Sequence, residues 1–108
     1  MSVRYEEMLN TLALGMWRKA TRTMGNTVSF TLRHILEYAN ANISELSKRD
    51  KWIMGALLSE FAKSAGCERR QTSYGIRIIC SKEGMPLGSF EEFREYLDRA
   101  VSKPVEPR

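Results

Sequence analysis

The chain has 108 residues, of which 43% are hydrophobic and 28% charged, and its net charge is +4. That size suits one domain, and this composition is typical of a folded globular protein rather than a disordered or fibrous chain. Two cysteines are too few for a disulfide framework, and no apolar run approaches the roughly 20 residues that span a bilayer. The start, MSVRYEEMLN, lacks a signal-peptide pattern, so we expect a cytoplasmic protein without a membrane segment.

The positive charge is concentrated in one part of the chain. Residues 43–82 carry eight Lys or Arg against four Asp or Glu, whereas residues 83–108 carry four against six. A basic segment of this kind is compatible with a nucleic-acid partner, because phosphate groups are bound by cations that share a surface.

Two helices are predicted in the first part of the chain. Residues 3–24 have apolar side chains at helical spacing, and Gly25 follows as a stop signal. A second helix is expected over residues 29–40, where Phe30 and Ile35 belong to its apolar face. Asn40 and the residues after it favour a turn.

The middle of the chain predicts a short helix over residues 44–49 and a longer one over residues 50–65. Gly66 has the position of a residue that ends a helix. Ser47 and Asp50 have capping-box spacing, so the short helix can instead be a turn that merges into the longer helix.

A β-hairpin is predicted over residues 67–81, which alternate in polarity and turn at Thr72–Gly75. This register places Cys67 opposite Cys80. Two states of the cysteines stay open, a cross-strand disulfide or buried neutral thiols, and we expect thiols in a reducing cytosol.

A last helix is predicted over residues 90–101, after a loop that contains Gly84, Pro86 and Gly88. Ser89 and Glu92 have capping-box spacing at its start. We therefore expect one domain over residues 1–102 and a flexible tail over residues 103–108.

The run LLSEFAKSAGCERRQTSYGIRIIC at Leu57–Cys80 carries a resemblance to a known family. A helix that ends in a small residue and glycine leads into a charged strand, a turn and an apolar return strand. With the preceding helices, this order resembles the winged-helix superfamily of DNA-binding proteins over Phe30–Ser81. The expected fold class is therefore α+β, mostly helical, a winged helix-turn-helix with extra N-terminal and C-terminal helices.

The resemblance implies a role for each element. Residues 29–40 and 44–49 would be the first two helices, residues 51–65 the recognition helix, and residues 69–77 the wing. Trp52–Ala65 contains no Gln, Asn or Arg, so the resemblance supports binding to duplex DNA more than readout of a specific sequence.

A DNA-binding surface is expected on the recognition helix and the wing. It combines cations for phosphate groups with side chains that can form hydrogen bonds to phosphates or base edges. The predicted residues are Lys48, Arg49, Lys51, Ser59, Lys63, Arg69, Arg70, Gln71, Thr72, Ser73, Tyr74 and Arg77. Trp17 and Trp52 lie in apolar stripes, so we expect core or interface positions for both rather than base stacking.

Catalytic and metal-binding chemistry has no support in this sequence. His34 is the only histidine, and the two cysteines with one histidine do not make a zinc site. No phosphate-binding glycine loop or nucleophile motif is present. We expect no enzymatic activity, no metal and no cofactor.

The first and last helices are expected to pair two copies of the chain, because both carry wide apolar stripes outside the winged-helix part. The residues of this homodimer interface would be Tyr5, Leu9, Leu12, Met16, Phe93, Leu97 and Val101. In the alternative, both helices fold back and complete a monomeric core.

Two functions follow from these expectations. The first is a small DNA-binding protein of the cytoplasm or nucleoid, such as a transcription regulator or a nucleoid, plasmid or viral factor. The second is a winged-helix module for protein–protein interaction in a replication, transcription or other assembly. In that case the apolar recognition helix would face a protein partner.

Overall fold

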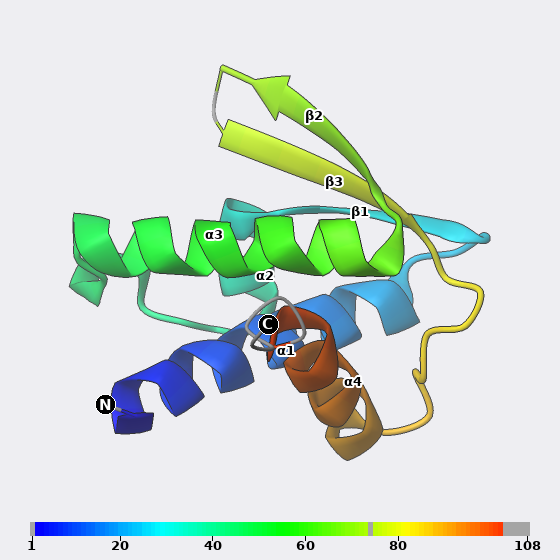
Figure 1. Cartoon of the computed structure of the whole chain (residues 1–108), viewed down its shortest axis with the longest axis horizontal. Helices are drawn as coiled ribbons and strands as arrows, with labels where there is room; N and C mark the ends of the chain where they lie inside the picture. Colours follow the sequence, from blue (N-terminus) through cyan, green and yellow to red (C-terminus); the bar gives the residue numbers. More distant parts are fainter. Residues whose placement is uncertain (1, 74, 103–108) are drawn as a thin grey trace, which may run out of the picture.

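Four α-helices and one three-stranded antiparallel sheet form the computed structural model, which describes residues 2–73 and 75–102 (Figure 1). The elements in chain order are α1 (Ser2–Arg22), β1 (Thr27–Thr31), α2 (Leu32–Tyr38), the 3₁₀ turn η1 (Ile43–Glu45), α3 (Lys48–Ala65), β2 (Glu68–Thr72), β3 (Gly75–Ser81) and α4 (Phe90–Ser102). The expected α+β class with a mostly helical chain is confirmed. Tyr74 and the tail predicted to be flexible, residues 103–108, lie outside the described residues.

The sheet has the strand order β1-β3-β2, so β3 is paired on both sides. Val28 lies opposite Cys80, and Phe30 lies opposite Ile78. All four of these side chains are buried, which assigns them to the face of the sheet that covers the core. The hairpin of β2 and β3 extends beyond this core, above α3 in Figure 1.

The strand β1 corrects the prediction of a helix over residues 29–40. Thr27–Thr31 alternates between exposed and buried positions, and β-branched side chains suit such a strand. The helix α2 starts only at Leu32, where the Thr31 Oγ1 accepts a hydrogen bond from the His34 backbone N–H at 3.2 Å. Asn40, with φ 59°, ends α2 in a left-handed conformation, as the predicted turn requires.

The start of α3 corrects the predicted short helix over residues 44–49. Residues 43–45 form only the 3₁₀ turn η1, and α3 begins at Lys48. Ser47 caps α3, because its side chain accepts from the Asp50 N–H while the Asp50 carboxylate accepts from the Ser47 N–H. The alternative prediction, a turn that leads into the longer helix through a capping box, is confirmed. Gly66, with φ 76°, ends α3.

The hairpin has the predicted register. Thr72 pairs with Gly75, and Glu68 pairs with Ile79. Cys67 and Cys80 are joined by a disulfide, with their Cα atoms 4.6 Å apart. The expectation of free thiols is therefore wrong, because this register brings the two Cα atoms within disulfide range.

The helices α1 and α4 pack into the chain's own core rather than leaving their apolar stripes exposed. Of the residues predicted for a dimer interface, six are at most 4% exposed: Leu9, Leu12, Met16, Phe93, Leu97 and Val101. Only Tyr5, at 37%, lies on the surface. The predicted surface position of these six side chains is wrong, because α1 and α4 bury them against each other and against α2 and α3. A homodimer stays a prediction.

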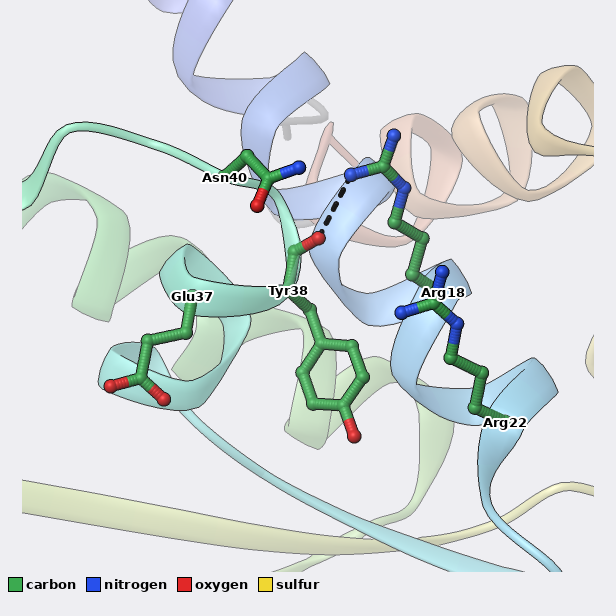
Figure 2. A pocket seen from close by; sticks show the side chains of 5 residues that line it. All are labelled: Arg18, Arg22, Glu37, Tyr38 and Asn40. Atoms are coloured by element: carbon green, nitrogen blue, oxygen red, sulfur yellow. Dashed lines mark hydrogen bonds between the residues drawn. The ribbon is translucent and has the colours of Figure 1, made fainter.

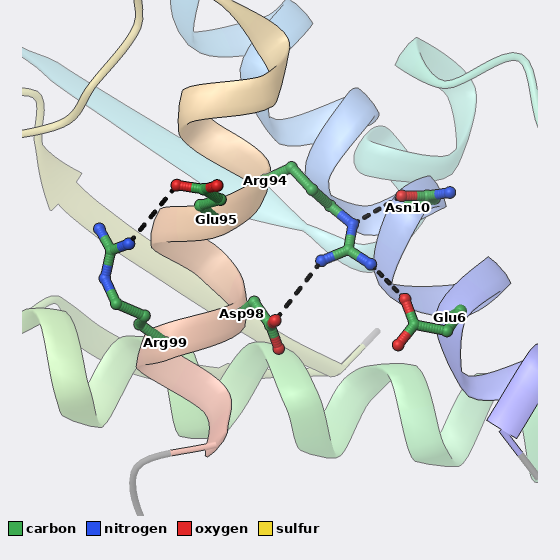
Figure 3. A network of polar contacts seen from close by, with 6 residues as sticks. All are labelled: Glu6, Asn10, Arg94, Glu95, Asp98 and Arg99. Atoms are coloured by element: carbon green, nitrogen blue, oxygen red, sulfur yellow. Dashed lines mark hydrogen bonds and ion pairs between the residues drawn. The ribbon is translucent and has the colours of Figure 1, made fainter.

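A polar network holds α4 against α1 (Figure 3). The Arg94 guanidinium donates to the Glu6 carboxylate and, at 2.6 Å, to the Asn10 Oδ1, and it lies 3.9 Å from the Asp98 Oδ2. The Arg94 side chain is only 19% exposed, so solvent screens these bonds less than a surface pair.

Replacing Arg94 with Ala is expected to lower the free energy of unfolding by about 1–2 kcal/mol, since it removes charged hydrogen bonds between two packed helices. Urea denaturation measures the loss. Arg99→Ala is the matched control, because Arg99 is 70% exposed and lies 3.8 Å from Glu95 on α4 itself. Equal losses in the two variants would contradict a structural role for the Arg94 network.

Candidate nucleic-acid interface

The helix α3 presents one long stripe to solvent. Its inner face is anchored by Met54, Leu58 and Phe61, all at most 3% exposed. The outward stripe repeats about once per turn, as residues three or four apart do on a helix. Its members are Arg49, Trp52, Ala56, Ser59 and Lys63.

Trp52 lies in this stripe and is 73% exposed. The predicted core position of Trp52 is therefore wrong, and the alternative, an interface position, stays a prediction. Trp17 differs: its Nε1 donates to the Leu87 carbonyl at 3.0 Å, and its ring lies edge-on to Phe90. Both tryptophans have the same prediction from the sequence, because each occurs among apolar residues. The spacing of Trp52 from Arg49 and Ala56 was the signal that could have separated them.

Arg69 joins the hairpin to α3. Its Nη1 donates a hydrogen bond to the Ser59 Oγ in the outward stripe. Arg69 is paired with Ile78, so both side chains lie on the face of the hairpin that is turned toward α3. The stripe residues together with Arg69 are called the α3–hairpin surface below.

The other hairpin arginines occupy the opposite face. Arg70 and Arg77 are direct cross-strand partners, and alternation along β2 turns Arg70 away from the side of Arg69. The Arg70 Nε donates to the Glu68 Oε2 at 2.7 Å. Arg77 approaches α1, where burial, and after it the charge of Arg77, lower the pKa of Lys19. The predicted set of three hairpin cations is thus divided between two faces.

The cations at the start of α3 are also divided. Lys48, Arg49 and Lys51 are all exposed. Lys48 and Arg49 precede Trp52 by four and three positions, so both lie on the side of the outward stripe. Lys51 follows Arg49 two positions later and so points roughly 200° further around the helix. At the other end of the stripe, Lys63 lies 3.7 Å from the Glu60 carboxylate.

The tip of the hairpin carries polar side chains. Thr72 Oγ1 donates to the Gly75 carbonyl at 2.7 Å, which helps to close the turn. Gln71 and Ser73 are exposed. Gln71 pairs with Ile76, so it lies on the same hairpin face as Arg69 and extends the α3–hairpin surface toward the tip.

Acidic side chains gather at the far side of the molecule. Glu91, Glu92, Glu95 and Asp98 are all exposed on α4. Figure 1 shows α4 on the side of the core away from the hairpin. Two of these carboxylates are paired on α4 itself, Asp98 with Arg94 and Glu95 with Arg99.

Comparison of the chain with protein families, curated proteins and solved structures finds no match. The winged-helix resemblance therefore stays a prediction from the order of elements. None of the helices in the described part of the chain is long and apolar enough to cross a membrane. Residues 2–73 and 75–102 contain no group of three or more His, Cys, Asp or Glu residues that could hold a metal ion.

Proposed function

We propose that this protein binds duplex DNA through the α3–hairpin surface, in the manner of a winged helix. The observation that carries the proposal is the hydrogen bond from Arg69 to Ser59, which unites a basic hairpin and the outward stripe of α3 in one surface. The helices α1, α2 and α3 followed by a hairpin, with β1 as a third strand, support the winged-helix interpretation. In this order α1 is the first helix of the unit rather than an extra one.

The length of the stripe suits a DNA groove. Arg49 and Lys63 are fourteen positions apart, which corresponds to about 21 Å along a helix axis. The major groove is about 12 Å wide, so cations at the two ends of α3 can reach phosphates on both of its sides. Few side chains of this stripe read base edges, which favours general DNA binding by a nucleoid or regulatory factor.

A titration of labelled random duplex DNA at two salt concentrations tests this function. Binding is expected to weaken steeply as salt rises, because phosphate contacts release counterions. Arg49→Ala and Lys63→Ala should each weaken binding to all sequences and reduce the salt slope by about one. Arg99→Ala removes the same charge from α4 and should leave affinity nearly unchanged. Absence of DNA binding at low salt, or an equal loss of affinity in all three variants, would contradict the proposal.

The exposure of Trp52 favours one second function, the docking of a protein partner. Trp and Arg side chains dominate the energetics of protein interfaces, and Trp52 lies one turn from Arg49. If the wild type binds no DNA, we expect Trp52 to anchor such a partner. Trp52→Ala would then weaken the complex by about 2 kcal/mol or more. If the protein binds DNA and Trp52→Ala leaves this affinity unchanged, the result favours DNA binding over the docking of a protein partner.

A further inference from the structure

A second polar site lies between α1 and α2, apart from the α3–hairpin surface. It is a pocket of about 520 Å³ lined by Arg18, Arg22, Glu37, Tyr38 and Asn40. Figure 2 shows both arginine side chains extending from α1 toward the C-terminal end of α2. Arg22, Glu37 and Asn40 are exposed, so the pocket is open to solvent on one side.

The two guanidinium groups are held in place by Tyr38. Arg18 Nη1 donates to the Tyr38 carbonyl at 2.9 Å, and the Arg22 guanidinium lies 5.9 Å from the centre of the Tyr38 ring. An arginine has five N–H donors in a fixed fork, so one bond or a stacking contact leaves donors for a ligand. Groups that are already positioned lose less conformational entropy when a ligand binds.

The charge in this pocket is positive. Arg18 and Arg22 are one turn apart on α1, an arrangement of like charges that destabilises a helix. Glu37 lines the same pocket, but its Oε2 accepts from the Arg33 Nε at 3.4 Å and points away from the two arginines (Figure 2). An anion bound between α1 and α2 would relieve the repulsion that Glu37 does not offset.

Asn40 adds a third donor. Its left-handed backbone ends α2 and places the side chain beside the pocket, with the amide nitrogen toward the Arg18 guanidinium in Figure 2. Both groups donate hydrogen bonds, so an acceptor oxygen placed between them would be bound from both sides. Tetrahedral oxyanions supply several acceptors at once, and arginine binds them in bidentate fashion.

We propose that this pocket binds a phosphoryl group, held by Arg18 and Arg22 with the Asn40 amide as a further donor. Two sources share this chemistry, a phosphate of the DNA backbone and a free phosphorylated small molecule. The proposal does not depend on the α3–hairpin surface, because the pocket is built from α1 and α2.

Titration of the wild-type protein with pyrophosphate, followed by ¹H–¹⁵N nuclear magnetic resonance, tests the site directly. The expected result is a saturable shift of the Asn40 side-chain amide and of the Arg18 and Arg22 Nε–H signals. No saturation up to about 10 mM pyrophosphate would overturn the proposal. Equal shifts at Arg99 and Arg33 would overturn it too, since they would indicate general attraction of anions to exposed cations.

Variants separate binding from a structural role of the arginines. Arg22→Gln should weaken the binding of pyrophosphate about tenfold, and Arg18→Gln should weaken it at least as much. Arg22 is exposed, so the fold should survive its replacement, which thermal unfolding checks. Arg99→Gln on α4 is the control with the same loss of charge. Unchanged affinity in Arg22→Gln would contradict the proposal even if Arg18→Gln is too unstable to measure.

A competition experiment then identifies the source of the phosphoryl group. If labelled duplex DNA and pyrophosphate displace each other, and Arg22→Gln lowers the salt slope of DNA binding, the pocket holds a backbone phosphate. If pyrophosphate binds but DNA does not bind, or if Arg22→Gln leaves the affinity for DNA unchanged, the ligand is a small phosphorylated molecule. Either result supports the pocket. If the proposed DNA function fails, pyrophosphate still binds to the pocket although DNA does not bind. If the pocket proposal fails, pyrophosphate does not bind, whatever DNA does.

Discussion

Replacing Gly15 with Ala is expected to destabilise the protein by about 3 kcal/mol, although Ala is the better helix former. The helix α1 crosses α2 at this glycine. A Cβ at Gly15 would lie 2.0 Å from the Ile35 carbonyl oxygen and 2.8 Å from its carbonyl carbon. Both atoms are backbone, and α2 is fixed at its ends by the Thr31 cap and by Asn40, so it cannot shift cheaply.

Urea denaturation of Gly15→Ala and Gly55→Ala would test this packing. Gly55 lies in α3, and a Cβ there meets nothing within 4 Å. Gly55→Ala is therefore expected to stabilise the protein by up to about 1 kcal/mol through helix propensity alone. The predicted result is that Gly→Ala lowers the free energy of unfolding in α1 and raises it in α3. A Gly15→Ala variant as stable as the wild type would contradict the close crossing of α1 and α2.

Loss of the disulfide between Cys67 and Cys80 is expected to lower the free energy of unfolding by about 3 kcal/mol. The bond closes a loop with a sequence separation of 13 that contains the whole hairpin. Such a link restricts the unfolded chain, so its removal favours unfolding even where the folded state changes little. We expect the ladder between β2 and β3 and the Arg69–Ser59 bond to hold the hairpin in the reduced protein.

Denaturation with and without a dithiol reductant measures this contribution. The variant with both Cys67→Ala and Cys80→Ala should unfold at lower denaturant than the oxidised wild type. Reductant should have no further effect on it, and that comparison controls for effects of the reductant itself. A wild type with the same midpoint in both solutions would show that the bond does not stabilise the fold.

Local signals made parts of the fold predictable. The Ser47–Asp50 box and Gly66 act within a few residues, and α3 begins and ends where they indicate. The hairpin register likewise follows from a short turn, which is why the opposition of Cys67 and Cys80 could be predicted before their bonding. Bonding itself depends on the distance between Cα atoms, which the sequence does not contain.

The residues of the α3–hairpin surface were mostly named from the sequence, but their grouping was not. Alternation predicts that Arg69 and Arg70 lie on opposite faces of β2, yet only the packing of the hairpin decides which face meets Ser59. Trp52 is absent from the predicted DNA-binding residues because it occurs among apolar residues, although its helical spacing from Arg49 and Ala56 indicates the exposed side of α3. The pocket at Arg18 and Tyr38 joins residues twenty positions apart, through a crossing of helices that no local motif encodes.

Near neighbours and composition are enough to predict the helical and extended tendencies of most segments, the helix caps and the basic character of residues 43–82. Only the fold shows that Ser29–Thr31 belongs to β1, since a short segment with strand tendency becomes a strand only when β3 supplies its hydrogen-bond partners. The fold also decides what α1 and α4 cover. An apolar stripe requires burial but does not specify its partner, and here Leu9 and Phe93 are buried within one chain.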